Sequence, residues 1–280
     1  MFESNPFAAL SATLSPAVMQ TFVGAMIILV AGGTIFDILH KKSAQYFFRN
    51  WQKAKSKGTQ PVSSGDMLSL AARTGASEVL TSSEFCNPNR RIAHLLTMYG
   101  FLAYVISTLA MVFWYPTPAT PTPSIWPLLW HLGALLVCIG GYWFWFFIRV
   151  DVAAEGQSPF RLMKADLFVV SLVASTTFAL LWAYMQASGN AVWTTVFLML
   201  YITASTVLFG SVPWSKFAHM FFKPAAAFEK RMSKANGSAQ NLPTLSRDEP
   251  EQQQRHSMEL LRDAPMRMGL GIKREAPRHY

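Results

Sequence analysis

Histidine is the residue type in this sequence with the clearest capacity for chemistry, and the chain carries six of them. A haem held by two imidazoles inside a membrane needs histidines on different helices at the same depth. His94 lies about one turn inside a long apolar block, and His219 lies near the end of another. We therefore predict that His94 and His219 are the two axial ligands of one haem iron.

The positions of the other ionisable residues near the apolar blocks indicate their roles. His131 lies near the opposite end of its block, where no second histidine is available, and His40 ends the first block. For each histidine the alternative interpretation is an interfacial side chain with a hydrogen-bond partner. Asp37 and Asp166 also lie at block ends, where we expect them to reach water. Buried haem propionates need cationic partners, and the candidates are Arg90, Arg91, Lys216 and Lys223.

The composition favours a membrane protein with several spans. Of the 280 residues, 51% are hydrophobic and only 14% are charged, against about 25% charged in ordinary soluble domains. The two cysteines are too few for a disulfide framework or a zinc site. These values exclude a disordered chain, a disulfide scaffold and a typical soluble enzyme.

The apolar residues form five blocks, each long enough for a helix that crosses a hydrocarbon core of about 30 Å. The predicted spans are 17–39, 92–114, 126–148, 165–186 and 191–222, the last bent at Pro213. With five spans, all 24 Lys and Arg residues fall on one side of the membrane. The positive-inside rule makes that side cytoplasmic. We therefore predict an all-α bundle with the N-terminus outside and the C-terminus in the cytoplasm.

The polar segments define the domain organisation. Residues 1–228 are predicted to form the membrane domain, with a long cytoplasmic loop at 41–91. Within that loop, residues 43–57 mix aromatic and basic side chains, which is typical of a helix on a membrane surface. Residues 63–80 open with capping residues and predict a short helix. Residues 229–280 are polar and are expected to be a disordered cytoplasmic tail.

Two stretches resemble a known family. NRRIAHLLTMYGFLAYVISTLAMVFW at 89–114 resembles the second span of the nitrate reductase gamma-subunit superfamily of cytochromes b, and VPWSKFAHMFFKPAAAF at 212–228 resembles the end of its fifth span. Membrane subunits of heterodisulfide-reductase-like, Qmo-type and DsrM-like complexes share these segments. Within the superfamily, the chain is similar to the AprM-type membrane anchors of adenylylsulfate reductase.

The resemblance implies one haem b rather than two. In two-haem members the second and fifth spans each carry two histidines. The matching positions here are His94 with Tyr104, and Tyr201 with His219. Both replaced histidines belong to the haem nearer the outer face. We therefore expect a single inner haem, with the tyrosines filling the vacated space or hydrogen-bonding across it.

The resemblance also implies a function in electron transfer. The chain would be a non-catalytic subunit of a redox complex in the bacterial inner membrane. It would pass electrons through its haem between a cytoplasmic oxidoreductase, expected to be adenylylsulfate reductase, and exchangeable membrane quinone. Two alternatives remain: a cofactor-free anchor for such an enzyme, or a small transporter. Nucleic-acid binding is not expected, because the basic runs are interrupted by apolar spans.

Overall fold

The structure is a computed structural model that describes residues 2–40, 42–83, 85, 87–150, 156, 158–163, 166–215 and 219–240. The side chains of residues 43, 219 and 221 lie outside this description. The described residues form helices and connecting turns, without a strand. An all-helical fold is therefore confirmed.

Five helices are long and apolar enough to cross a membrane, as the sequence predicted. They are α2 (Pro16–His40), α5 (Pro88–Phe113), α6 (Ile125–Trp143) continued by the π-helical turn η2 (Phe144–Ile148), α7 (Leu167–Ala187) and α8 (Ala191–Gly210). The helix that carries His94 begins with a cap and a proline: the Asn87 side chain accepts from the backbone N–H groups of Asn89 and Arg90, and Pro88 occupies the first turn.

The fifth span ends earlier than the sequence predicted. Helix α8 stops at Gly210, and a new helix, α9 (His219–Ala235), follows a turn that contains Pro213. Proline has no N–H to continue a helix, so Pro213 accompanies a break rather than a bend. The 20 residues of α8 give a length of about 30 Å, which matches the hydrocarbon core. His219 therefore belongs to a separate helix beyond the span.

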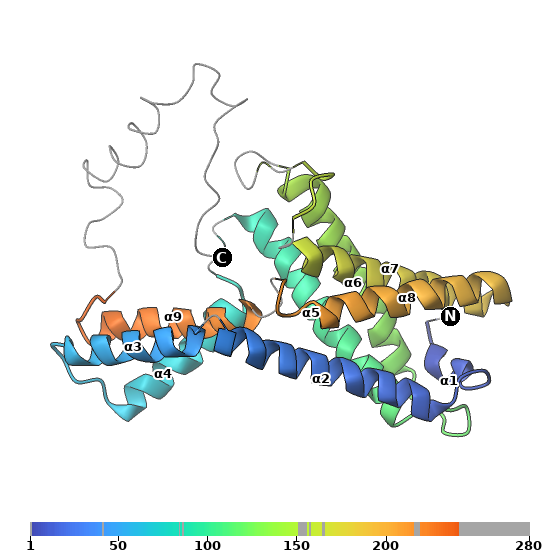
Figure 1. The fold of residues 1–280 in the computed structure, drawn as a ribbon, viewed down its shortest axis with the longest axis horizontal. Helices are drawn as coiled ribbons and strands as arrows, with labels where there is room; N and C mark the ends of the chain where they lie inside the picture. Colours follow the sequence, from blue (N-terminus) through green and yellow to red (C-terminus); the bar gives the residue numbers. More distant parts are fainter. Residues whose placement is uncertain are drawn as a thin grey trace, which may run out of the picture.

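The spans pack as two close pairs, α5 with α6 and α7 with α8, joined through α6 and α7, while α2 lies against α8 and α5 (Figure 1). Small residues allow the first pair to approach closely. A Cβ atom on Gly133 would lie only 2.7 Å from the carbonyl oxygen of Gly100 and 2.7 Å from the backbone nitrogen of Tyr104. The α5–α6 contact therefore depends on glycine at this position.

We predict that Gly133→Ala destabilises the protein by about 1–3 kcal/mol, because the α5 backbone must shift to admit the methyl group. The matched control is Gly24→Ala in α2, where a Cβ atom meets nothing within 4 Å. That substitution is expected to stabilise its helix by up to about 1 kcal/mol. Thermal unfolding in detergent measures both changes, and equal effects would contradict the close-packing argument.

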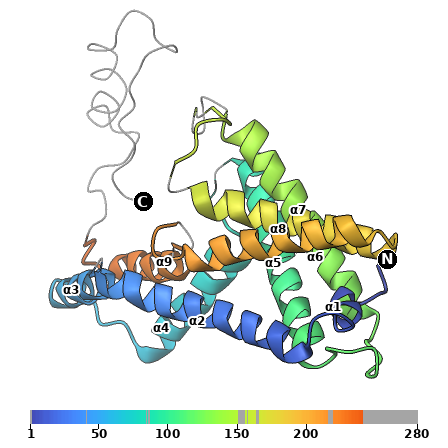
Figure 2. The same cartoon turned by 45° about the vertical axis from the view of Figure 1, so that its right-hand side comes forward.

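The remaining helices gather at one end of the molecule (Figure 2). Helices α3 (Ser43–Ser56), α4 (Ser64–Thr74) and α9 and the π-helical turn η1 (Gly75–Leu80) lie beyond the ends of the spans, opposite the short helix α1 (Pro6–Leu10). We call these the basic end and the α1 end. The helix expected within 63–80 is confirmed as α4, with Ser63 as its N-cap.

Helix α3 packs one of its aromatic residues against α9, while Tyr46 and Phe48 are exposed. The Trp51 ring stacks on the Phe228 ring of α9, with centroids 5.8 Å apart, and Ala54 is buried. The apolar face expected to meet a membrane surface is therefore covered in part by α9. Helix α9 also runs across the expected boundary at 228/229 and ends at Ala235. Residues 241–280, most of the predicted tail, lie outside the described residues.

Candidate functional site

His94 lies two turns into α5, facing the turn that follows η1. Its Nδ1 atom is 3.1 Å from the hydroxyl oxygen of Ser82. Ser82 is only 1% exposed, and its backbone is left-handed, with φ of 47°. A non-glycine residue held in this region is strained, and such residues concentrate at functional sites. The turn therefore places a buried hydroxyl against one nitrogen of His94.

Phe85 connects His94 to cationic residues on two helices. Its ring centroid is 4.9 Å from that of His94. The Arg90 guanidinium carbon of α5 is 5.7 Å from the same ring, and the Lys223 Nζ atom of α9 is 5.6 Å from it. These distances are within the range of cation–π contacts. Two of the four predicted propionate partners therefore converge beside His94.

The structure describes only part of the other predicted site residues. His219 is the first residue of α9, one helical turn before Lys223, so its backbone lies at the basic end near the His94 cluster. Its side chain lies outside the described residues, as does the whole of Lys216. Arg91 is directed elsewhere: its Nε atom donates to the Thr81 carbonyl oxygen at 2.7 Å.

The π-helical turn η1 contacts both neighbouring helices, α5 and α9. The Tyr99 hydroxyl of α5 donates to the Leu80 carbonyl at 2.7 Å. Arg231 of α9 forms an ion pair with Glu78 at 2.8 Å. Sequence reasoning missed Ser82 and Phe85 as site residues. The small polar residues after Leu80 indicate a turn, but they do not reveal which helix the turn contacts.

His131 lies at the α1 end and is fully buried. Its Nδ1 atom lies 2.7 Å from the Pro127 carbonyl one turn earlier, and its Nε2 atom has no hydrogen-bond partner among the described residues. The rings of Phe2 and Trp130 meet it edge-on, with centroids 5.1 and 5.0 Å away. His131 is therefore packed as a core residue, far along the spans from His94.

Tyr104 and Tyr201 pack among other aromatic rings toward the α1 end. Tyr104 stacks on Trp130 at 5.4 Å, and Tyr201 stacks on Trp182 at 5.8 Å. The two indoles meet edge-on at 6.3 Å, and Phe7 of α1 contacts both of them. All five rings are buried. A solid aromatic cluster therefore occupies the core between the spans at this end.

The prediction that Asp37 and Asp166 reach water was wrong. They are only 2% and 7% exposed. Asp166 is buried because the Arg149 guanidinium pairs with it at 2.6 Å and the chain at 158–163 covers both groups. Among the described residues, no group of three or more His, Cys, Asp or Glu side chains is arranged to hold a metal ion.

A family model described as citrate utilization protein B matches residues 62–240, more than half of the chain. The chain belongs to the citrate utilization protein B family. Comparison with curated proteins and with solved structures gives no match. The matched range begins after α3 and includes the Ser82 turn, the four spans α5 to α8, and α9. The whole His94 cluster therefore lies in the part of the chain that defines the family.

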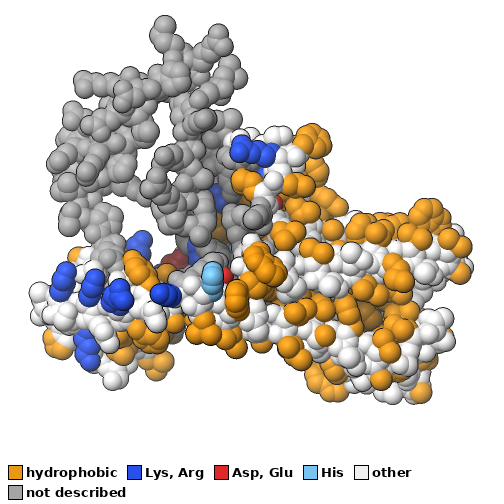
Figure 3. Space-filling view, viewed as in Figure 1, with side chains coloured by type: hydrophobic (Ala, Val, Ile, Leu, Met, Phe, Trp, Pro, Cys, Tyr) orange, Lys and Arg blue, Asp and Glu red, His pale blue; other side chains and the backbone are white. Residues whose placement is uncertain are grey.

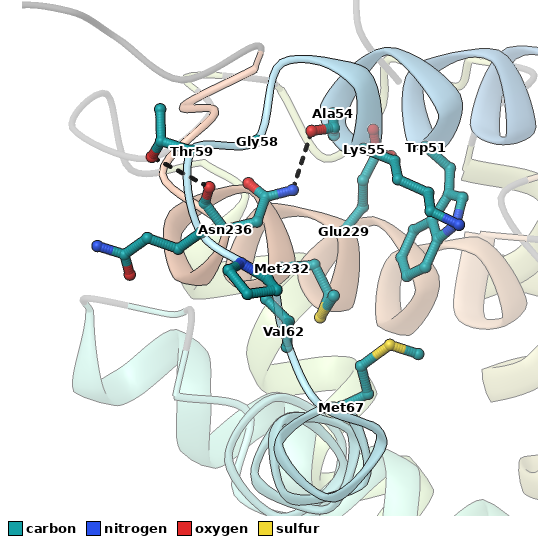
Figure 4. A pocket seen from close by; sticks show the side chains of 12 residues that line it. Trp51, Ala54, Lys55, Gly58, Thr59, Val62, Met67, Glu229, Met232 and Asn236 are labelled. Carbon is teal, nitrogen blue, oxygen red and sulfur yellow. Dashed lines mark hydrogen bonds between the residues drawn. The ribbon is translucent and has the colours of Figure 1, made fainter.

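A second feature lies at the start of the matched range. A cavity of about 500 Å³ opens between α3, the following loop, α4 and α9 (Figure 4). The side chains of Met67 and Met232 extend into it from α4 and α9, and the Asn236 amide donates to the Ala54 carbonyl at 2.9 Å. The remaining lining residues are Trp51, Lys55, Gly58, Thr59, Gln60, Pro61, Val62 and Glu229.

The carboxyl group in this cavity makes stability depend on pH. Burial raises the pKa of Glu229 above its ordinary value of 4.5, so that between the two pKa values the folded protein binds more protons at this carboxyl than the unfolded chain does. The contribution of this carboxyl to stability is then greatest below pH 4.5 and falls as pH rises through the raised pKa. We predict that Glu229→Gln removes this fall, so that the variant is the more stable protein only at higher pH. Thermal unfolding across pH tests this, and a pH-independent difference would contradict it.

Proposed function

We propose that this member of the citrate utilization protein B family is a membrane electron-transfer subunit that holds one haem b between His94 and His219. A bound haem b would accept and release one electron at a time. A quinone takes up two electrons and two protons on becoming a quinol, so each quinone would require two such transfers. The catalytic chemistry would belong to a soluble oxidoreductase.

The observation that carries the proposal is the environment of His94. A histidine that binds a metal usually fixes its second nitrogen with a hydrogen bond. The Ser82 hydroxyl lies 3.1 Å from Nδ1 of His94, which makes Nε2 the nitrogen for iron. The backbone of His219 lies one turn from Lys223, which reaches the same Phe85 ring as His94 does. An imidazole at position 219 would complete the pair of nitrogen ligands that a haem held by two histidines needs.

The charges and the packing around the proposed site fit one haem at the basic end. Arg90 and Lys223 lie beside His94 and would pair with the propionates. At the α1 end, Trp130, Trp182 and Tyr104 pack against one another, which supports a single cofactor. The concentration of Lys and Arg at the basic end supports a cytoplasmic location for that end, in a bacterial inner membrane with the N-terminus outside.

Two soluble partners fit the proposal. The resemblance of the spans to the AprM-type anchors favours adenylylsulfate reductase. The family description, citrate utilization protein B, favours an oxidoreductase of citrate metabolism. Both would deliver electrons to the basic end or collect them there. Purified candidates of each kind, assayed for quinone-dependent turnover with this chain in vesicles, would separate the two partners.

The decisive experiment is a reduced-minus-oxidised spectrum of the purified full-length protein. We expect the absorption bands of a b-type haem, at about one haem per chain. A protein purified from haem-replete cells with no such bands would refute the electron-transfer proposal. That result would favour the alternative, a cofactor-free membrane anchor for a cytoplasmic redox enzyme.

A further inference from the structure

The exposed surface of α3 and α9 carries a row of uncompensated positive charge. Figure 3 shows Lys and Arg side chains in a row over this part of the molecule. The exposed basic residues of these two helices and the α3 C-cap are Arg49, Lys53, Lys55, Lys57, Lys230 and Lys234. None of them forms an ion pair with another described residue. Nothing acidic lies between residues 42 and 65.

The charges on α3 are arranged as a stripe. Arg49, Lys53 and Lys57 are spaced four residues apart and so share one face of the helix. That face is exposed and lies to one side of the face that meets α9, where Asn50 and Ala54 are buried and Trp51 stacks on Phe228. Like charges at this spacing each disfavour the helix by about 0.2–0.5 kcal/mol. A bound acidic surface would remove this repulsion.

The position of α3 favours a protein rather than the membrane as the occupant. Helix α3 continues past the end of α2 and away from the spans (Figures 1 and 2). Lys57 lies 14 residues beyond Ser43, about 21 Å along the helix. Screening in physiological salt limits the attraction of lipid headgroups to about 8 Å. The far half of the stripe therefore lies beyond their reach.

We infer that the α3 stripe, Arg49, Lys53 and Lys57, is the docking surface for an acidic face of a soluble protein. The inference rests on the proposed function in that it identifies this protein with the redox partner. Complementary charge of this kind steers encounter and weakens with salt. Helix α9, which contacts α3 through the stacked Trp51 and Phe228 rings, contains the backbone of His219 and the side chain of Lys223. Docking here would bring the partner to the helix that leads into the His94 cluster.

The test measures binding of fluorescein-labelled decaglutamate to the full chain in phosphatidylcholine nanodiscs at low ionic strength. Arg49→Glu with Lys53→Glu is expected to weaken binding at least about tenfold, equivalent to about 1.4 kcal/mol. The matched control is Arg73→Glu with Arg161→Glu, which reverses the same number of exposed charges elsewhere. The control is expected to change binding by less than about twofold.

Two outcomes would overturn the inference. Equal weakening in both double variants would mean that only the net charge matters. Loss of decaglutamate binding when phosphatidylglycerol replaces phosphatidylcholine at about 0.15 M salt, where headgroup fields extend only about 8 Å, would mean that anionic headgroups occupy the stripe. The haem spectrum of the same preparations keeps the two proposals separate, because the stripe variants should retain the b-type bands. If the protein binds decaglutamate through the stripe but contains no haem, the proposed function is refuted and the docking surface is still supported.

Discussion

His94→Ala is expected to abolish the b-type haem spectrum of the purified protein. The substitution removes one of two proposed axial nitrogens, and the remaining contacts to haem would come from apolar side chains and the propionate partners. His219→Ala is expected to have the same effect, because a bis-histidine site needs both imidazoles. Haem content per chain, measured by the pyridine haemochrome method, gives the result directly.

Three further variants make this prediction specific. Ser82→Ala leaves the imidazole in place but removes its neighbour at Nδ1, so we expect haem affinity to fall about 10–100-fold. His40→Ala removes an exposed histidine at the same end of the molecule, and His131→Ala removes the buried one at the α1 end. Both should retain a full complement of haem. Loss of haem in His131→Ala alone, with the protein still monodisperse, would mean that the wrong histidine pair had been chosen.

The number of spans was predictable because the bilayer imposes a simple requirement of about 20 apolar residues per helix. The end of the fifth span was not predictable in the same way. Val212 and Trp214 continue the apolar block past Gly210 although Ser211, Ser215 and Lys216 interrupt it, so the block has no sharp end. Pro213 indicated an irregularity, but a proline in an apolar segment is compatible with both a kink and a helix end.

Only the ionisable side chains of the candidate site could be predicted from the sequence. His94, Arg90 and Lys223 stand out in the sequence because ionisable groups are rare near spans. Ser82 and Phe85 do not stand out, since serine and phenylalanine are common and their role depends on a turn that folds against α5. Contacts between residues 82 and 94, or across the 138 positions between Phe85 and Lys223, come from tertiary packing that no local pattern encodes.

Arg149 and Asp166 also make tertiary contacts that local sequence patterns do not predict. The position of Asp166 at the end of a span predicted a side chain in water, and nothing in the sequence singled out Arg149, but the structure buries both. The Arg149 guanidinium lies 4.2 Å from the Trp145 ring, and it donates to the Ser158 and Arg161 carbonyls at 2.8 and 2.7 Å. Asp166 Oδ2 accepts from Arg149 at 2.6 Å and from the Met163 backbone at 2.9 Å. This ion pair joins the end of η2 to the start of α7.

We therefore predict that Asp166→Asn destabilises the protein by about 3–5 kcal/mol, because it leaves the Arg149 charge buried without a counter-charge. Arg149→Ala should cost a similar amount for the opposite reason. Replacing both residues together, Arg149→Met with Asp166→Leu, should restore much of the lost stability, since no charge then stays buried.

The matched surface control is Arg161→Ala, whose side chain is exposed, with an expected change within about 0.5 kcal/mol. Unfolding in mixed detergent micelles measures all four variants. A single variant that matched the surface control would show that the pair is hydrated in the folded protein, and a double variant as unstable as the sum of the two single variants would rule out the electrostatic cause.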